Sequence, residues 1–178
     1  MLRPFAFASM LLLASGLAHA GGDPLSHAAE CAVWARELSF ADSVARHDAA
    51  AFAAHVDPDA VFDAGGARPV RGRAAVVSAW SDIVAGRGVA LVWYPARTTA
   101  GTGAAATVAW STGPYLMTAT DAKGEVHRTT GTFRSVWRRD GHGRWRVLYD
   151  AGGNDRRAAT ADDVAAFEAG RHATCPPD

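Results

Sequence analysis

The sequence predicts an α+β fold in which helices come first and a curved sheet of antiparallel strands follows. Two observations carry this prediction. Apolar side chains recur at helical spacing between residues 26 and 84, whereas residues 89–150 hold five β-rich segments separated by Gly, Pro, Asp or Lys. Within the second region, residues 130–153 form two aromatic strands around a Gly-flanked turn. Strands joined by short turns pair antiparallel, and the helices then cover one face of the sheet.

The first twenty residues are expected to be a cleaved export signal. A basic start at Arg3 is followed by an apolar stretch, and Ala18-His19-Ala20 predicts cleavage after Ala20. A membrane anchor is the alternative, but the apolar stretch is shorter than the ~20 residues that a spanning helix needs. The remaining length suits one domain. We therefore expect a periplasmic or secreted protein with no membrane span after cleavage.

The charge balance argues against a nucleic-acid partner. The chain has 18 basic and 18 acidic residues, so no long-range field favours DNA, RNA or an anionic membrane. One local basic cluster lies on the predicted aromatic hairpin. Charge on an exposed strand resists edge-to-edge pairing, so a solvated hairpin is the favoured interpretation and an anion site the alternative. The cluster comprises Arg138, Arg139, Arg144 and Arg146.

The helical first half contains three predicted helices and one small hairpin. Asp57-Pro58 ends the second helix, because the residue before proline disfavours helical geometry. Gly86 and Gly88 end the third helix. The predicted elements are helices over 26–46, 49–56 and 73–86, with short strands over 60–63 and 69–71 joined by a Gly-Gly turn.

The second half is predicted as a meander of strands and a final helix. Thr160 and Asp163 form a capping pair at the start of that helix, and Gly170 terminates it. The predicted strands cover 89–99, 104–111, 115–120, 125–139 and 145–150, and the helix covers 160–169.

Export gives the two cysteines a structural role. Cys31 lies in the first helix and Cys175 lies near the end of the chain. Two thiols in an oxidising compartment usually pair, so we expect a disulfide that ties the C-terminal segment, residues 159–178, to the first helix. An intermolecular bridge and a reactive thiol are the alternatives.

Six local motifs in this order carry a family resemblance. They are Phe40-Ala41, His47-Asp48, Val61-Phe62-Asp63 through Arg73, Trp93 with Pro95, Trp110 to Gly113 with Tyr115, and Gly131 through Trp137 and Trp145 to Asp150. The chain resembles the nuclear transport factor 2-like superfamily, and within it the SnoaL-like proteins and the group catalogued as domain of unknown function 4440. The resemblance implies a cone-shaped, cystatin-like α+β barrel over residues 21–158. It also implies a pocket between sheet and helices, often in a homodimer.

Asp63 is the first candidate for chemistry. The segment 63–72, DAGGARPVRG, resembles in spacing the turn that carries the general-base Asp of ketosteroid isomerases. A carboxylate in an apolar pocket has a raised pKa and moves protons near neutral pH. The alternative is structural, because an Asp before Gly-Gly caps its own turn.

The oxyanion donors of those isomerases have no counterpart in this sequence. The position of the donating Tyr falls on Phe40, and residues 104–120 contain no acid. Steroid-type isomerisation is therefore disfavoured. A second set of residues lies on strands that are expected to border the cavity, with Asp150 as a second candidate base. The other members of the set are Trp93, Trp110, Tyr115 and His127, although the Trp residues also suit the core or a dimer face.

No metal or cofactor is expected, because the histidines lack zinc-ligand spacing. The favoured function is an exported, homodimeric pocket protein that binds a small apolar or aromatic ligand, with Phe40 as a further lining residue. The alternative is a proton-transfer enzyme, an isomerase, lyase or polyketide cyclase, with Asp63 or Asp150 as general base. A third possibility is a scaffold whose cavity is filled by its own side chains.

Overall fold

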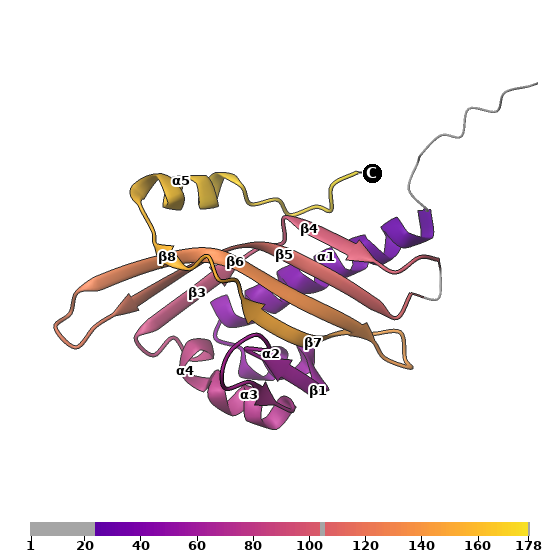
Figure 1. Ribbon diagram of the computed structural model, residues 1–178, viewed down its shortest axis with the longest axis horizontal. Coiled ribbons are helices and arrows are strands. Elements are labelled where there is room, and N and C mark those ends of the chain that lie inside the picture. The colour runs from indigo at the N-terminus through magenta and orange to yellow at the C-terminus, as the bar shows by residue number, and fades with distance from the viewer. Residues whose placement is uncertain (1–23, 104–105, 178) are drawn as a thin grey trace, which may run out of the picture.

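The computed structural model describes residues 24–103 and 106–177, and it has the predicted order of helices and strands (Figure 1). The predicted signal peptide, residues 1–20, lies outside this range. Among the described residues, none of the helices is long and apolar enough to cross a membrane. The helices are α1 (Pro24–Ala45), α2 (Ala49–His55), α3 (Arg73–Ala79), α4 (Ser81–Val84) and α5 (Ala161–Ala169). The strands are β1 (Val56–Phe62), β2 (Val70–Arg71), β3 (Val89–Trp93), β4 (Arg97–Ala100), β5 (Val108–Thr120), β6 (Val126–Arg139), β7 (Trp145–Gly152) and β8 (Arg157–Ala158).

The sheet is curved, open and mixed rather than fully antiparallel. Its strand order is β2-β1-β7-β6-β5-β3, with β4 also paired to β5 and β8 to β6. The exception to antiparallel pairing is β1 with β7, which are parallel. Short turns force neighbours in sequence to run antiparallel, but β1 and β7 are far apart in the chain and no turn constrains them. The register shifts between Val56 and Val61, which accommodates Pro58 inside β1.

Strand β5 runs through Gly113-Pro114, where the sequence predicted a break. Its partner strand carries the irregularity instead. Trp93 pairs with Tyr115 and Arg97 with Thr112, so one extra residue bulges out between β3 and β4. A Cβ atom at Gly113 would lie 2.0 Å from the backbone oxygen of Tyr94, so only glycine fits against this bulge. The predicted strand 89–99 is therefore β3 and β4 joined by the bulge.

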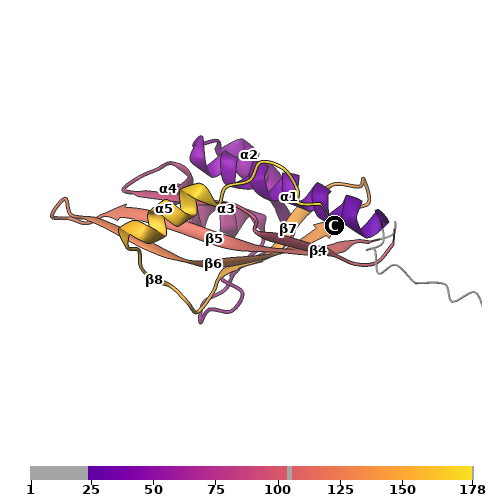
Figure 2. The same ribbon diagram turned by 90° about the horizontal axis from the view of Figure 1, so that it is seen from above.

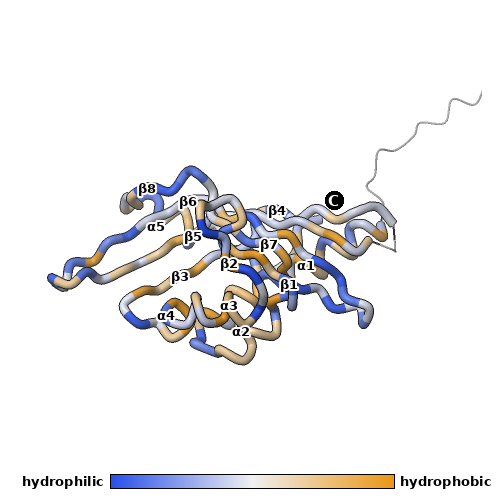
Figure 3. Tube along the Cα trace, turned by 60° about the horizontal axis from the view of Figure 1, so that its bottom comes forward, coloured by the Kyte–Doolittle hydropathy of each residue, from blue (hydrophilic) through white to orange (hydrophobic). Residues whose placement is uncertain are grey.

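The core lies between the helices and one face of the sheet. Figure 2 shows α1 and α2 on the same side of the strands, and Figure 3 shows hydrophobic stretches on both the strands and the helices. Phe40 of α1 is fully buried, with its ring 5.4 Å from Phe52 and 5.3 Å from Trp93. The predicted third helix is divided at Trp80 into α3 and α4, and there Trp80 stacks on Phe52 at 5.4 Å.

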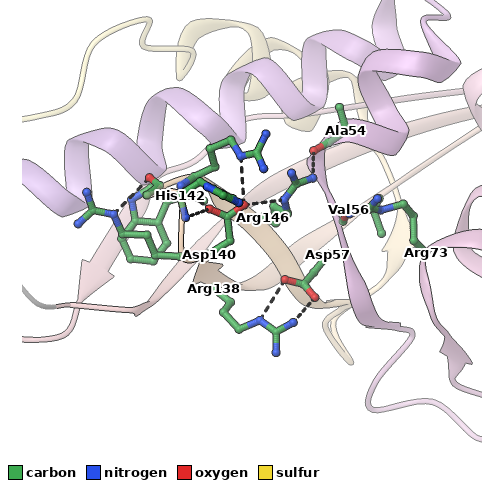
Figure 4. Close-up of polar contacts among 12 residues, drawn as sticks. Ala54, Val56, Asp57, Arg73, Arg138, Asp140, His142 and Arg146 are labelled. Atoms are coloured by element: carbon green, nitrogen blue, oxygen red, sulfur yellow. Dashed lines mark hydrogen bonds and ion pairs between the residues drawn. The ribbon is translucent and has the colours of Figure 1, made fainter.

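Three arginines of the basic cluster on the β6–β7 hairpin, Arg138, Arg144 and Arg146, pair with acids of the protein itself, and Figure 4 shows the pairs of Arg138 and Arg146. Arg139 donates instead to the backbone oxygen of Gly143. Arg138 Nε donates to Asp57 Oδ2 at 3.0 Å, and its Nη2 lies 2.8 Å from Asp59. Asp57 is 2 % exposed, so Arg138 compensates a nearly buried charge. Arg146 Nε lies 3.3 Å from Asp140. These pairs join β6 to β1 and close the hairpin turn, which supports the interpretation of a charged hairpin over that of an anion site.

Cys31 and Cys175 form the predicted disulfide within the chain, with their Cα atoms 5.2 Å apart. The predicted capping box of Thr160 and Asp163 begins α5. Phe167 of α5 packs on Tyr94 with ring centroids 4.9 Å apart. The C-terminal segment is thus fixed to the domain at two points.

Candidate functional site

A pocket of about 370 Å³ opens between the sheet and α4. Its wall is mostly apolar, and two carboxyl groups and one guanidinium group converge on it. Strands β3, β5, β6 and β7 provide most of the wall, and the turn after β1 completes it. The lining residues are Asp63, Trp80, Ile83, Leu91, Trp93, Tyr115, Met117, Phe133, Asp150, Gly152 and Arg156.

The aromatic part of this wall is continuous. The rings of Trp80 and Trp93 meet edge to face with centroids 6.5 Å apart, and Trp93 meets Phe133 at the same distance. Tyr115 lies on the neighbouring strand, directly opposite Trp93. Burial raises the pKa of the Tyr115 hydroxyl, so this group stays neutral at physiological pH. The wall therefore offers aromatic faces and one hydroxyl.

Asp150 places a carboxyl group of unusual proton affinity in the pocket. It lies near the end of β7 and is half-buried, with Ser135 Oγ donating to its Oδ2 at 2.8 Å. Burial, reinforced by the nearby negative charge of Glu37, raises the pKa of Asp150 to about 7, and the Ser135 hydrogen bond opposes this shift. At neutral pH Asp150 is therefore poised between the acid and the carboxylate.

Glu37 of α1 lies behind this wall in the core and has no exposed surface. Trp93 Nε1 donates to its Oε1 at 2.6 Å, while Ser111 Oγ and Trp137 Nε1 donate to its Oε2 at 2.5 and 3.0 Å. Burial raises the pKa of Glu37, and these hydrogen bonds act against the rise. Glu37 thereby fixes the orientation of Trp93, a pocket residue.

The sequence interpretation did not include Glu37. A signal was present, because Glu37 falls on the buried stripe of α1 that also contains Trp34, Phe40 and Val44. A charged residue in an apolar stripe needs buried partners. Those partners come from strands far away in the chain, so the sequence did not indicate which groups would supply them.

Asp63, unlike Asp150, lies on the exposed rim of the pocket. It follows β1 with a positive φ of 54° and is exposed at the pocket rim. Its backbone oxygen accepts from Gly66 N at 2.9 Å, and a Cβ atom at Gly66 would lie 2.1 Å from Asp63 Oδ2. Asp63 therefore takes part in its own turn through its backbone oxygen, and its side chain borders the pocket.

The other predicted ligand contacts divide into two groups. Trp93 and Tyr115 line the pocket, whereas the remaining three lie outside it. Phe40 is enclosed by core rings. Trp110 is an odd number of residues from Tyr115 on the same strand and so faces the other side of the sheet. His127 lies near the outer end of β6, where its Nε2 is 3.0 Å from Asp121.

A second hollow of about 390 Å³ lies between α1, β3 and the C-terminal segment. Its carboxyl group, Asp42, is exposed and paired with Arg46 at 2.9 Å. Within the described ranges, one group has metal-ligand proximity, namely His27, Cys31 and Cys175. Both sulfurs are in the disulfide and are not thiolate ligands. The pocket that contains Asp150 is therefore the candidate site.

Residues 36–151 match the family model described as the SnoaL-like domain. A comparison with curated protein sequences gave no significant match. Solved structures of similar fold include an NTF2-like protein of unknown function from Pseudomonas putida KT2440. It is 20 % identical, with a TM-score of 0.55, covering 72 % of this chain and 87 % of that protein.

Two further structures are similar. A ketosteroid isomerase-like protein from Erwinia carotovora atroseptica is 18 % identical with a TM-score of 0.56, covering 68 % of this chain and 93 % of that one. A nuclear transport factor 2-like superfamily protein from Salmonella enterica is 14 % identical with a TM-score of 0.54, covering 73 % and 93 %. At these identities the structures establish the fold alone. The narrower assignment to the domain of unknown function 4440 group stays a prediction.

The raised pKa of Asp150 predicts a pH dependence of stability. The native state holds the proton up to about pH 7 and the unfolded state releases it near 3.8, so the Asp150 contribution falls as pH rises between these values. The full pKa shift corresponds to a loss of up to about 4 kcal/mol in the free energy of unfolding. We expect Asp150→Asn to remove this loss. The urea midpoint of the variant minus that of wild type should therefore increase as the pH is raised from 4 to 8.

Comparing the two proteins at each pH is necessary because His55 acts in the opposite direction. Burial lowers the pKa of His55 to about 4, so its contribution to stability rises with pH up to its unfolded value. This contribution is common to both proteins and cancels in the difference. Parallel curves for wild type and Asp150→Asn would contradict the raised pKa.

Proposed function

The chain belongs to the SnoaL-like family, and from that membership and the pocket geometry we propose that it binds a small, largely apolar or aromatic molecule. The observation that carries the proposal is a half-buried carboxyl group, Asp150, in a wall of aromatic side chains. Pockets for small molecules combine an apolar lining with a few converging polar groups. Asp150 supplies the polar contact, as acid or as carboxylate, and the rings of Trp80, Trp93 and Phe133 supply the apolar contact area.

Filling the pocket tests the proposal. Ile83 lines it from α4, so Ile83→Trp is expected to occupy the space that a ligand needs. With the uncharged fluorescent probe N-phenyl-1-naphthylamine, we expect this variant to bind at least about tenfold more weakly than wild type, because apolar contact area is lost. Ala45→Trp, which fills the second hollow, is the matched control and should leave probe binding unchanged. If both variants lose probe affinity equally, or if neither variant loses any, this pocket is not the binding site.

A second candidate function, proton-transfer catalysis, is favoured by the pKa of Asp150. A general base works best when its pKa is near the operating pH, and Tyr115 in the same pocket is a neutral donor that could polarise a carbonyl group. For this candidate we expect the protein to catalyse deuterium exchange at the C–H next to the carbonyl of enolisable aromatic ketones. The rate should rise with pH through about 7, as the carboxylate forms.

Two variants separate this candidate from binding alone. Asp150→Asn should lower the exchange rate by roughly 10² to 10⁴, because the base is removed while the pocket is kept. Asp63→Asn should change it little. If the protein binds the fluorescent probe but deuterium exchange is no faster than in buffer, the binding function stands and this catalysis is excluded.

The proposal includes export to the periplasm or beyond, and homodimerisation through the outer sheet face. The disulfide supports export, because such bonds persist in oxidising compartments. Expressed with its leader, the protein is expected to leave the cytoplasm, begin at residue 21, contain no free thiol and run as a dimer in light scattering. Reduction should lower its unfolding free energy by up to about 4 to 5 kcal/mol, given the 144-residue separation of the cysteines. Recovery of a reduced cytoplasmic protein with its first residues intact would contradict export.

A further inference from the structure

We propose that the ligand of this pocket is an organic cation, and that Glu37 is the buried residue that makes the pocket select a positive charge. The inference rests on the proposed function, since it names the ligand class of the same pocket. It depends on the charges around the pocket, on the faces of its aromatic rings, and on the contact between Glu37 and Trp93.

The ionisable groups that face Asp150 are mostly acidic. The turn after β1 contributes Asp63, α1 contributes Glu37 from behind the wall, and the segment after β7 contributes Arg156. Strand β5 adds the neutral Tyr115, while β6 adds the hydroxyl of Ser135. Asp63 and Arg156 are both exposed, so water screens both charges, whereas Glu37 is fully buried and a charge on it is screened far less.

Among the described residues, neither the buried Glu37 nor the half-buried Asp150 has a basic partner. Within residues 24–103 and 106–177, no Lys, Arg or His nitrogen lies within salt-bridge distance of Glu37 or Asp150. Their hydrogen bonds come from neutral groups, the indoles of Trp93 and Trp137 and the hydroxyls of Ser111 and Ser135. A buried carboxylate without a countercharge is costly. A positively charged ligand would supply that countercharge, whereas a neutral one would not.

The aromatic wall also favours a cation. Rings attract positive charge over their faces, and the attraction is stronger where water is excluded. Trp80, Trp93, Tyr115 and Phe133 all border the space next to Asp150. Trp93 Nε1 donates to Glu37 Oε1 at 2.6 Å, and a carboxylate acceptor polarises the indole, which makes its face more negative. Glu37 thus acts on the ligand through Trp93 as well as through Asp150.

Two probes of the same shape test the inference. Benzyltrimethylammonium carries a permanent charge, and neopentylbenzene has carbon in place of its nitrogen. By tryptophan fluorescence titration at pH 8, we expect wild type to bind the cation at least about tenfold more tightly than the neutral probe. This preference should shrink as pH falls towards 5, because Asp150 becomes protonated, whereas the affinity for the neutral probe should stay constant.

Two variants test the role of Glu37. Glu37→Gln should reduce the preference for the cation severalfold while neopentylbenzene binds as before. Asp150→Asn should reduce it in the same way, and it provides the decisive comparison if circular dichroism shows that Glu37→Gln does not fold. Asp162→Asn removes one exposed negative charge on α5 and should leave the preference unchanged.

The outcomes distinguish failure of the inference from failure of the proposed function. If neopentylbenzene binds wild type as tightly as the cation does, cation selection is overturned and the binding pocket remains. If a folded Glu37→Gln or Asp150→Asn variant keeps the full preference, the role of that acid in the selection is overturned. If neither probe binds wild type, and if Ile83→Trp leaves the binding of N-phenyl-1-naphthylamine unchanged, both the proposed function and the inference are overturned.

Discussion

The burial of Glu37 is the constraint on which the site depends. A carboxyl group with no exposed surface is tolerated only where donors surround it, and this fold supplies an indole from β3, an indole from β6 and a hydroxyl from β5. These strands meet α1 only when the sheet has its observed register. The polar cluster therefore ties the first helix to the middle of the sheet, and an apolar contact would not specify that alignment as closely.

The same cluster also determines the chemistry of the pocket. Trp93 contacts Glu37 with its ring nitrogen and the pocket with its ring, so the two environments share one side chain. Burial and, to a lesser extent, the charge of Glu37 raise the pKa of Asp150 to about 7. A binding or catalytic role for Asp150 therefore depends on Glu37, a core residue that does not line the pocket.

Sequence patterns predicted the parts of the fold that local signals determine. The aromatic hairpin of β6 and β7, the capping box of α5 and the disulfide follow from short-range turn and cap chemistry and from the count of two cysteines. The parallel pairing of β1 with β7 and the bulge facing Gly113 depend on contacts between distant segments, which no local pattern encodes. For the site, Asp150, Trp93 and Tyr115 were expected to border the cavity, and they line one pocket. Trp110 was a candidate for the same lining but faces the other side of the sheet, which the sequence left open because apolar residues alone do not fix strand register. Glu37 was missed because its hydrogen-bond donors lie on three strands that are distant from α1 in the sequence.

A direct test of this account is the titration of Asp150 itself, followed by carbon-detected NMR of the side-chain carboxyl group in wild type and in Glu37→Gln. We expect a midpoint near 7 in wild type and a lower midpoint in the variant, since one of the two causes of the shift is removed. A midpoint near 4 in wild type, or the same midpoint in both proteins, would contradict the claim that a buried acid behind the wall controls the pocket.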